Sequence, residues 1–371
     1  MFRNCVSGKK YSIIKSMNIT QIREKIEETL KSYLPEASVQ TWQFQNFGKL
    51  PDSISETHFQ QLLSPCFSLM SLGGKRWRPV LQVLCAMMVS NQKNHTTDVP
   101  ESFNLTPLVE FVHTASLIHD DIEDGADTRR GKPAIHITYG IDTAINAGSW
   151  LYFAAPAAID SLDIPQEKKN IYYRLFTKEL RRLHLGQAMD IYWHRNHEIF
   201  PTMKEYKAMV QNKTGTLSCL AVSLGVLSGG GTLDEAEKAG EIARSIGEGF
   251  QILDDVQNLT TGNPGKKRGD DIVEGKKSLP VLIHIENCPD DKEKISNYFQ
   301  NAQKEGIISV DIENCIELLE KSGSIKKAFE SGRALVKEKT LELVHLFEKS
   351  ELLSEPAEQI ISLFDQMLPT I

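Results

Sequence analysis

Two acidic clusters, 134 residues apart, are the part of this chain best suited to chemistry. One reads Asp-Asp-Ile-Glu-Asp at 120–124, and the other reads Asp-Asp-Val-Gln-Asn at 254–258. Each follows a long apolar run with helical spacing. Carboxylates crowded at a helix C-terminus repel one another and oppose the helix dipole, at a cost of roughly 0.3–1 kcal/mol per charge. A bound cation removes that penalty, so the clusters predict a cation site.

The chemistry of these ligands favours magnesium over zinc. Carboxylate oxygens suit hard cations, and the chain contains no Cys-x-x-Cys or His-Glu-x-x-His pattern of the kind that binds zinc. Magnesium characteristically takes one or two carboxylates, several waters and substrate phosphates. A single acidic cluster is more often a solvated surface turn, but two such clusters with cations nearby predict a magnesium diphosphate site.

Basic side chains occur near both clusters with the spacing of phosphate ligands. Arg129 and Arg130 follow the first cluster, and guanidinium groups suit diphosphate oxygens that accept forked hydrogen bonds. Upstream, Lys75 and Arg78 follow a glycine pair and can point the same way if that segment turns helically. Further cations follow in the second half of the chain, namely Lys213, Lys266, Lys267, Arg268 and Lys276. Each alone is more often a surface charge, so their repeated placement near the clusters is the informative feature.

A helix over 106–124 must position the first cluster. It begins with Thr106, whose side chain can cap the helix, and with Pro107, which suits a first helical turn. Apolar residues then recur at helical spacing, so we expect a mostly buried helix. Its acidic end should emerge from the core with Asp120 and Asp124 on one face.

Helical patterning continues from 60 to 285, and strand-like alternation is scarce. Capping-box patterns at Thr202-x-x-Glu205 and Thr232-x-x-Glu235 predict the starts of two further helices. A chain of 371 residues with 40% hydrophobic content can bury a large core. We therefore predict a single all-α domain over 17–371, a helical bundle that charged amphipathic helices after residue 290 complete.

Composition excludes several functional classes. The net charge of −7 disfavours nucleic acid as a partner, because binding to a phosphate backbone needs a basic face. The longest nearly apolar run, 150–159, contains a proline and falls far short of the roughly 20 residues that span a bilayer. There is no Gly-x-Ser-x-Gly elbow and no convincing Ser-His-Asp arrangement. His194 and His197 are best interpreted as surface residues rather than metal ligands.

The cysteines and the N-terminal residues indicate the cellular compartment of the protein. Six cysteines are scattered without the spacing of a disulfide framework, which indicates reduced thiols in an intracellular compartment. Residues 1–16 carry four basic residues and no acid, which fits a targeting leader or an upstream start codon. With no clear cleavage pattern, we expect a disordered leader and a cytoplasmic protein.

The chain resembles the trans-isoprenyl diphosphate synthases of the polyprenyl synthetase family. The resemblance covers roughly 60–285 and rests on stretches that occur in the family's order: Gly73–Pro79, Glu110–Asp120, the first acidic cluster with Arg129–Gly131, Gly186–Asp190, Lys213–Gly215, Phe250–Asp255 and Asp271–Lys276. It implies an isoprenoid-synthase-type helical bundle with a central active-site cavity, and a homodimer.

The same resemblance implies roles for individual residues. Three magnesium ions would be held with a bound allylic diphosphate by Asp120, Asp124 and Asp254, and Asp121 and Asp255 belong to the same catalytic motifs. That diphosphate would bind Arg129, Lys213, Thr214, Gln251, Lys276 and one of Lys266 and Lys267, between which spacing does not decide. Isopentenyl diphosphate would bind Lys75, Arg78, His113 and Arg130. Gln187 and Asp190 resemble a pair near the reacting carbons, although a structural polar role fits them equally well.

The implied reaction is a magnesium-dependent head-to-tail condensation of isopentenyl diphosphate with an allylic diphosphate, which makes the protein a prenyltransferase. Small residues one turn before Asp120, namely Ala115 and Ser116, should leave room for a long product, although they could instead permit close helix packing. The stretch 131–140, followed by 145–147, and Asn258 resemble geranylgeranyl diphosphate synthases, so we expect a C20 product. The alternatives are a longer-chain synthase, a class I terpene synthase and a non-catalytic regulatory subunit.

Overall fold

The computed structural model describes residues 17–262, 267–348, 350 and 352–369. Within these ranges the chain is almost entirely helical. Its first ten helices are α1 (Ile19–Tyr33), α2 (Gln40–Phe47), α3 (Glu56–Ser71), α4 (Trp77–Asn94), α5 (Pro100–Asn104), α6 (Pro107–Glu123), α7 (Ile135–Tyr139), α8 (Ile141–Ala154), α9 (Ala157–Asp160) and α10 (Gln166–His194). They are followed by α11 (Met203–Lys213), α12 (Gly215–Ser228), α13 (Leu233–Thr260), α14 (Asp270–Val273), α15 (Leu279–Asn287), η1 (Pro289–Asp291), α16 (Lys292–Glu305), η2 (Gly306–Ile308), α17 (Val310–Lys321), α18 (Ser324–Phe347) and α19 (Glu355–Met367).

One short hairpin interrupts the helices of the described residues. Strand β1 (Thr128–Arg129) pairs antiparallel with β2 (Lys132–Pro133) directly after the first acidic cluster. The proposed leader 1–16 and Lys266 lie outside the residues that the structure describes.

The all-α prediction is confirmed, and so are three of the predicted helix starts. Both capping boxes form, because Thr202 and Thr232 each accept a hydrogen bond from the backbone of the glutamate three residues later. Helix α6 begins at Pro107 as predicted. The expected side-chain cap of α6 does not form, because Thr106 is itself in helical conformation and its hydroxyl donates to the carbonyl of Phe103. That acceptor belongs to α5, which ends just before Thr106.

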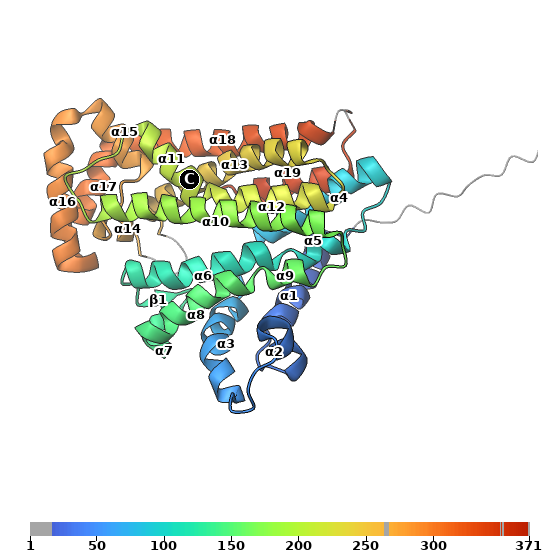
Figure 1. Cartoon of the computed structure of the whole chain (residues 1–371). Coiled ribbons are helices and arrows are strands. Elements are labelled where there is room, and N and C mark those ends of the chain that lie inside the picture. Colours follow the sequence, from blue (N-terminus) through green and yellow to red (C-terminus); the bar gives the residue numbers. More distant parts are fainter. Residues whose placement is uncertain (1–16, 263–266, 349, 351, 370–371) are drawn as a thin grey trace, which may run out of the picture.

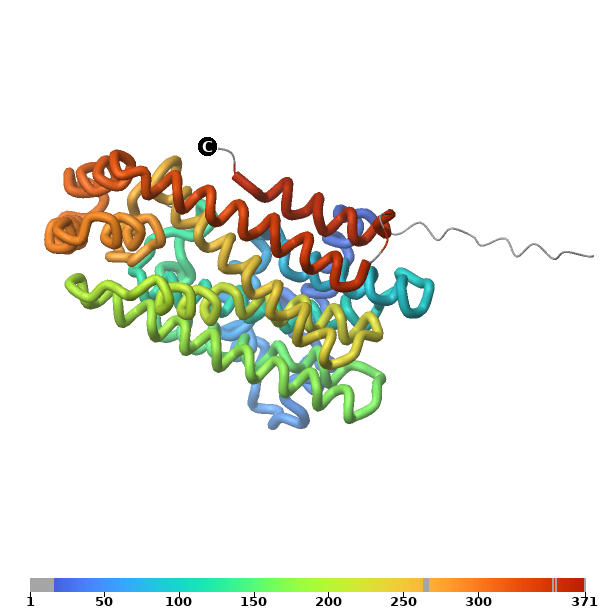
Figure 2. The backbone as a smooth tube through the Cα atoms, turned by 90° about the horizontal axis from the view of Figure 1, so that it is seen from above, coloured from blue at the N-terminus to red at the C-terminus, as the bar shows by residue number. Residues whose placement is uncertain are grey.

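The long helices lie side by side in the body of the molecule (Figure 1). Helix α13 packs against α12 and α18, α12 packs against α4, and α6 packs against α8. Figure 2 shows α10, α13 and α18 crossing the molecule with nearly aligned axes. Helices α16 to α19 complete the bundle after residue 290, as the sequence predicts. No helix in the described ranges is both long and apolar enough to cross a membrane.

Glycines allow the site-bearing helices to approach closely. A Cβ on Gly186 of α10 would lie 2.8 Å from the Cα of Lys213, at the end of α11. A Cβ on Gly247 of α13 would lie 2.8 Å from the Cα of Gly215, at the start of α12. Because these contacts involve backbone atoms, no side-chain rearrangement could relieve the overlap. Two of the motif glycines, Gly186 and Gly215, therefore help to fix how these helices pack.

Candidate active site

A cavity of about 1130 Å³ lies among α4, α6, α8, α10, α11 and α13. Along α10 its wall runs from Asp190 and Gln187 at one end to a mixed segment with Phe176 and Tyr173 at the other. The 17 residue steps from Tyr173 to Asp190 correspond to about 25 Å of helix at 1.5 Å per step. The cavity is therefore long, with an acidic mouth and an apolar interior.

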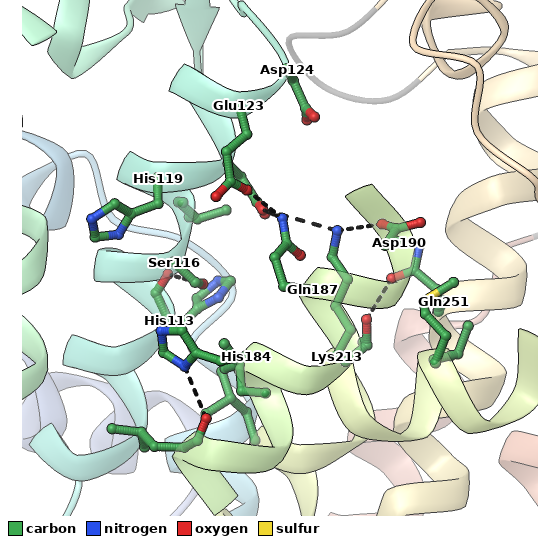
Figure 3. A pocket seen from close by; sticks show the side chains of 18 of the residues that line it. His113, Ser116, His119, Glu123, Asp124, His184, Gln187, Asp190, Lys213 and Gln251 are labelled. Carbon is green, nitrogen blue, oxygen red and sulfur yellow. Dashed lines mark hydrogen bonds and ion pairs between the residues drawn. The ribbon is translucent and has the colours of Figure 1, made fainter. Parts of the chain in front are cut away.

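The acidic mouth is built from both clusters. Asp120, Glu123 and Asp124 come from the end of α6, and Asp254 comes from α13, all lining the same cavity. Gln187 lies across the mouth, where its Nε2 donates to Asp120 Oδ1 at 2.7 Å and to Glu123 Oε2 at 2.5 Å (Figure 3). The structure thus brings together carboxylates that lie far apart in the sequence.

Asp190 holds a lysine beside this mouth. The Nζ of Lys213 lies 2.7 Å from Asp190 Oδ2 and 4.0 Å from Asp120 Oδ1 (Figure 3). His194, one turn further along α10, places its Nε2 2.9 Å from the other oxygen of Asp190. Burial acts to raise the pKa of Asp190, but Lys213 and His194 outweigh it and hold the pKa well below its usual value. Asp190 is therefore a buried anion that positions the ammonium of Lys213.

A second network connects α11, α13 and the loop before α15. Thr214 Oγ1 donates to Gln251 Oε1 at 2.7 Å, and Gln251 Nε2 donates to Asp255 Oδ1 at 2.9 Å. The Nζ of Lys276 lies 2.9 Å from Asp255, and Tyr206 donates to the same carboxylate at 3.0 Å. Burial acts to lower the pKa of Lys276, but Asp255 and its neighbours raise it well above the usual value. Lys276 is therefore a fixed cation on the cavity wall.

Cationic residues gather on the opposite side, near the start of α4. Arg78 lines the cavity with its guanidinium 4.4 Å from the ring centroid of Trp77, and its buried Nε has no hydrogen-bond partner. Burial lowers the pKa of Arg78 to about 10. Burial and the adjacent guanidinium groups of Arg78 and Arg130 lower the pKa of His113 well below its usual value. His113 is thus neutral at pH 7 and can donate one hydrogen bond.

Most sequence-predicted site residues line this one cavity. They are Arg78, His113, Ser116, Asp120, Asp124, Arg129, Gln187, Asp190, Lys213, Thr214, Gln251, Asp254, Asp255 and Lys276. Asp121 does not line it, because its side chain is buried under Arg129, which donates to it. Burial raises the pKa of Asp121 despite that partner.

Other predicted residues also lie away from the cavity wall. Lys75 is exposed, because the chain takes a left-handed turn at Arg76 (φ 48°) before α4 begins. The expected helical turn that would align Lys75 with Arg78 is therefore absent. Arg130 donates to the carbonyl of Gly73. Lys267 is exposed, and Lys266 falls outside the described ranges.

The two residues expected to control product length are in different environments. Ser116 lines the cavity, whereas Ala115, on the same helix, is fully buried and is not part of the wall. An aromatic group also lies on the wall, close to the acidic mouth. Tyr152 of α8 stacks on His119 of α6 with 5.6 Å between ring centroids, and meets the edge of His184 of α10 at 5.3 Å.

Sequence reasoning missed several residues of the wall. No motif includes Tyr152, His184 or Tyr206. Lys277 directly follows the motif residue Lys276, but no role was predicted for it. The surface interpretation of His194 was wrong, since His194 lines the cavity beside Asp190. The i, i+4 spacing of Asp190 and His194 was the one sequence signal that could have indicated this contact.

Known proteins resemble this chain in sequence and in structure. A family model described as Polyprenyl synthetase matches residues 59–318. A short chain isoprenyl diphosphate synthase of Methanocaldococcus jannaschii is 35% identical over 256 residues, which cover 68% of this chain and 75% of the relative. A geranylgeranyl pyrophosphate synthase of Apiospora sacchari is 34% identical over 261 residues, covering 69% and 73% respectively. The crystal structure of a geranylgeranyl pyrophosphate synthetase from Pyrococcus horikoshii matches with a TM-score of 0.77 at 29% identity, covering 95% of this chain and 98% of that one.

Proposed function

This chain is a member of the polyprenyl synthetase family, and from that premise we propose that it joins isopentenyl diphosphate head-to-tail to an allylic diphosphate, giving trans-geranylgeranyl diphosphate (C20). The observation that carries the proposal is one cavity with carboxylates from two distant helices and fixed cations at its mouth, and with apolar helix faces behind them. Such a cavity suits a ligand with a charged head and a long hydrocarbon tail.

We propose Mg²⁺ as the cofactor, with three ions held by Asp120, Asp124 and Asp254. The donor set fits a hard cation, because carboxylate oxygens line the mouth and none of the cysteines in the described ranges lines the cavity. When bound, the ions would neutralise negative charge on the departing diphosphate.

The protein groups that would hold the allylic diphosphate surround that mouth. Lys213 and Lys276 supply positive charge in fixed positions, because Asp190 and Asp255 hold them. Arg129 is held in the same way by Asp121. Preorganised cations of this kind stabilise charge as it develops, without reorganisation during the reaction. Asp121, Asp190 and Asp255 would thus act by positioning cations.

Isopentenyl diphosphate would bind on the side of α4. Arg78 offers a guanidinium whose buried Nε has no hydrogen-bond partner, and His113 offers a neutral imidazole as a single donor. Arg130 lies close enough to lower the pKa of His113 and would add charge. An exposed Lys75 could reach this diphosphate only if its loop moves towards the cavity.

The reaction follows from this placement. The allylic C–O bond breaks, and its electron pair leaves with the diphosphate. The π electrons of isopentenyl diphosphate form the new C–C bond to the allylic cation, and loss of a proton to the departing pyrophosphate restores a double bond. Holding both substrates in one cavity makes the encounter effectively intramolecular.

Product length would depend on the apolar interior. Ser116 is small and leaves space one turn behind Asp120, while the rings of Tyr152, His119 and His184 lie together on the cavity wall near the mouth. We propose that this aromatic group limits the product to C20.

The test is a product analysis with purified protein, labelled isopentenyl diphosphate and each of the C5, C10 and C15 allylic diphosphates, with and without magnesium. We expect magnesium-dependent elongation that stops at C20. Longer products would favour the long-chain alternative. Hydrocarbon or alcohol products without isopentenyl incorporation would favour a terpene synthase, and no turnover would favour a regulatory subunit.

A variant pair tests the acidic mouth. Asp254→Asn removes a proposed magnesium ligand and should lower kcat by at least about a hundredfold, the scale of losing one electrostatic group in a catalytic site. Asp163→Asn, at an exposed aspartate outside the cavity wall, should leave kcat unchanged. Near-normal turnover by Asp254→Asn would contradict the site assignment.

Family membership also supports a homodimer, which we propose as the assembly. Light scattering on the purified chain would measure its mass against the 41.7 kDa of one copy.

A further inference from the structure

A second cluster of possible metal ligands lies away from the cavity, where α15 ends and η1 begins. His284, Cys288 and Asp291 each offer a ligand atom, and these atoms all lie within 4.8 Å of one another. His284 Nε2 is 3.0 Å from Asp291 Oδ2. We propose that these three residues bind one Zn²⁺ ion, with water as the fourth ligand.

The backbone arranges these residues before any metal binds. His284 lies in the last turn of α15, and Cys288 is the C-cap residue, whose amide donates to the carbonyl of His284 at 2.8 Å. The amide of Asp291 in turn donates to the carbonyl of Cys288 at 3.1 Å. Pro289 restricts both its own φ and the conformation of Cys288. Little conformational entropy would therefore be lost on binding.

Burial distinguishes this cluster from an ordinary surface ion pair. The side chain of His284 is 2% exposed, so its imidazole is held in one orientation with Nε2 towards Asp291. Asp291 is 32% exposed and Cys288 is partly exposed, so the cluster is open to solvent on one side. That opening gives the ion an entry path and space for a water ligand.

The donor types favour zinc over magnesium. A thiolate and an imidazole suit a borderline-soft cation, and three protein ligands with one water is a common zinc arrangement. Cys288 is also the one free cysteine that is not buried within the described ranges. A Cys288 thiolate and the Asp291 carboxylate together balance the charge of a divalent ion.

The position of the cluster indicates what the ion would do. The nine-residue helix α15 follows directly from Lys277 and Ser278, which line the main cavity. The cluster lies at the other end, about 14 Å of helix away. An ion there would tie the end of α15 to η1 and the start of α16, and would stabilise the wall without touching substrate. The proposal does not depend on the reaction at the main cavity.

Cobalt is a suitable probe, because a Co²⁺–thiolate bond gives a near-ultraviolet charge-transfer absorption that carboxylate sites cannot give. We would titrate Co²⁺ into the full-length, chelator-treated chain in buffer saturated with Mg²⁺. We expect the absorption to saturate at one equivalent and to disappear when Zn²⁺ is added. Zn²⁺ should also raise the Tm, since it would bind only the folded cluster.

Matched variants separate this site from any other. Cys288→Ser should abolish the absorption, and Asp291→Asn should weaken Co²⁺ binding by about tenfold or more. Asp290→Asn, at an exposed neighbour outside the cluster, should behave like the unaltered chain. Failure to observe the absorption, or its persistence in Cys288→Ser, would overturn the proposal. An equal rise in Tm for Cys288→Ser and the unaltered chain would also overturn it.

Discussion

Lys277 is a buried lysine whose charge is poorly compensated. Lys277 is 2% exposed, and the rings of Phe200 and Phe299 lie beside its ammonium group. Its Nζ donates to the carbonyl of Gly275 at 2.8 Å. Burial lowers the pKa of Lys277 from 10.5 to about 7. Between these two pH values the unfolded chain binds more protons than the folded chain at this group.

The free energy of unfolding contributed by Lys277 should therefore rise with pH from about 7 to 10.5, by at most about 1.4 kcal/mol per pH unit. Lys277→Met removes the group, so its stability advantage should be largest below about pH 7 and should shrink towards about pH 10. Urea unfolding at several pH values would measure the difference. Lys292→Met, at an exposed lysine near the same Phe200 ring, should show no such trend. A constant difference for Lys277→Met would contradict the lowered pKa.

The partly exposed Lys213 and the buried Asp190 form a pair whose loss should affect stability and turnover differently. Lys213→Met leaves Asp190 without its ammonium partner and should lower the free energy of unfolding by about 3 kcal/mol. The double variant Lys213→Met/Asp190→Asn should recover most of that stability but not kcat, because the cation at the cavity mouth is still missing. Lys207→Met, on the same helix and 56% exposed, serves as the control. Recovery of turnover in the double variant would show that the cation is dispensable.

At the scale of elements, Gly186 decides how closely α10 approaches the end of α11. Gly186→Ala places a Cβ against the backbone of Asn212 and Lys213, so the helices must separate. We expect a loss of about 1–3 kcal/mol in the free energy of unfolding, as for other overpacked sites. We also expect a large fall in kcat, because Gln187 and Lys213 would move apart at the cavity mouth.

Chemical denaturation and steady-state kinetics would measure both effects. Leu185→Ala, at the neighbouring position and 58% exposed, should change neither by much. Normal kcat in a stable Gly186→Ala variant would mean that the spacing of these helices is not critical.

At the scale of the whole molecule, side chains of three helices meet at Tyr152 on the cavity wall. Tyr152→Ala removes the ring that contacts His119 and His184, and should lengthen the product by at least one five-carbon unit. Chromatography of the dephosphorylated products would measure this. Tyr192→Ala, at a tyrosine that is 53% exposed, should leave the product length unchanged. An unchanged product with Tyr152→Ala would place the limit elsewhere in the cavity.

The sequence by itself determined the local structure of this protein. Helix hydrogen bonds join residues four apart, so apolar spacing and caps suffice to predict α6 and the starts at Thr202 and Thr232. The acidic clusters and their neighbouring cations could also be recognised from the sequence, because they form short local motifs. Thr106, however, does not cap α6. Its hydroxyl donates instead to a carbonyl of α5, a helix that the sequence pattern did not indicate.

Only the tertiary structure decided which of these side chains share a cavity. A side chain's direction depends on the rotation of its helix and on the helices packed against it. Those packing contacts join distant segments such as α4 and α12. Lys75 and Arg78 separate because of one left-handed turn, while Tyr152, His119 and His184 meet although no motif connects them. Local hydrogen bonding sets the helices, but their packing sets the chemistry of the space between them.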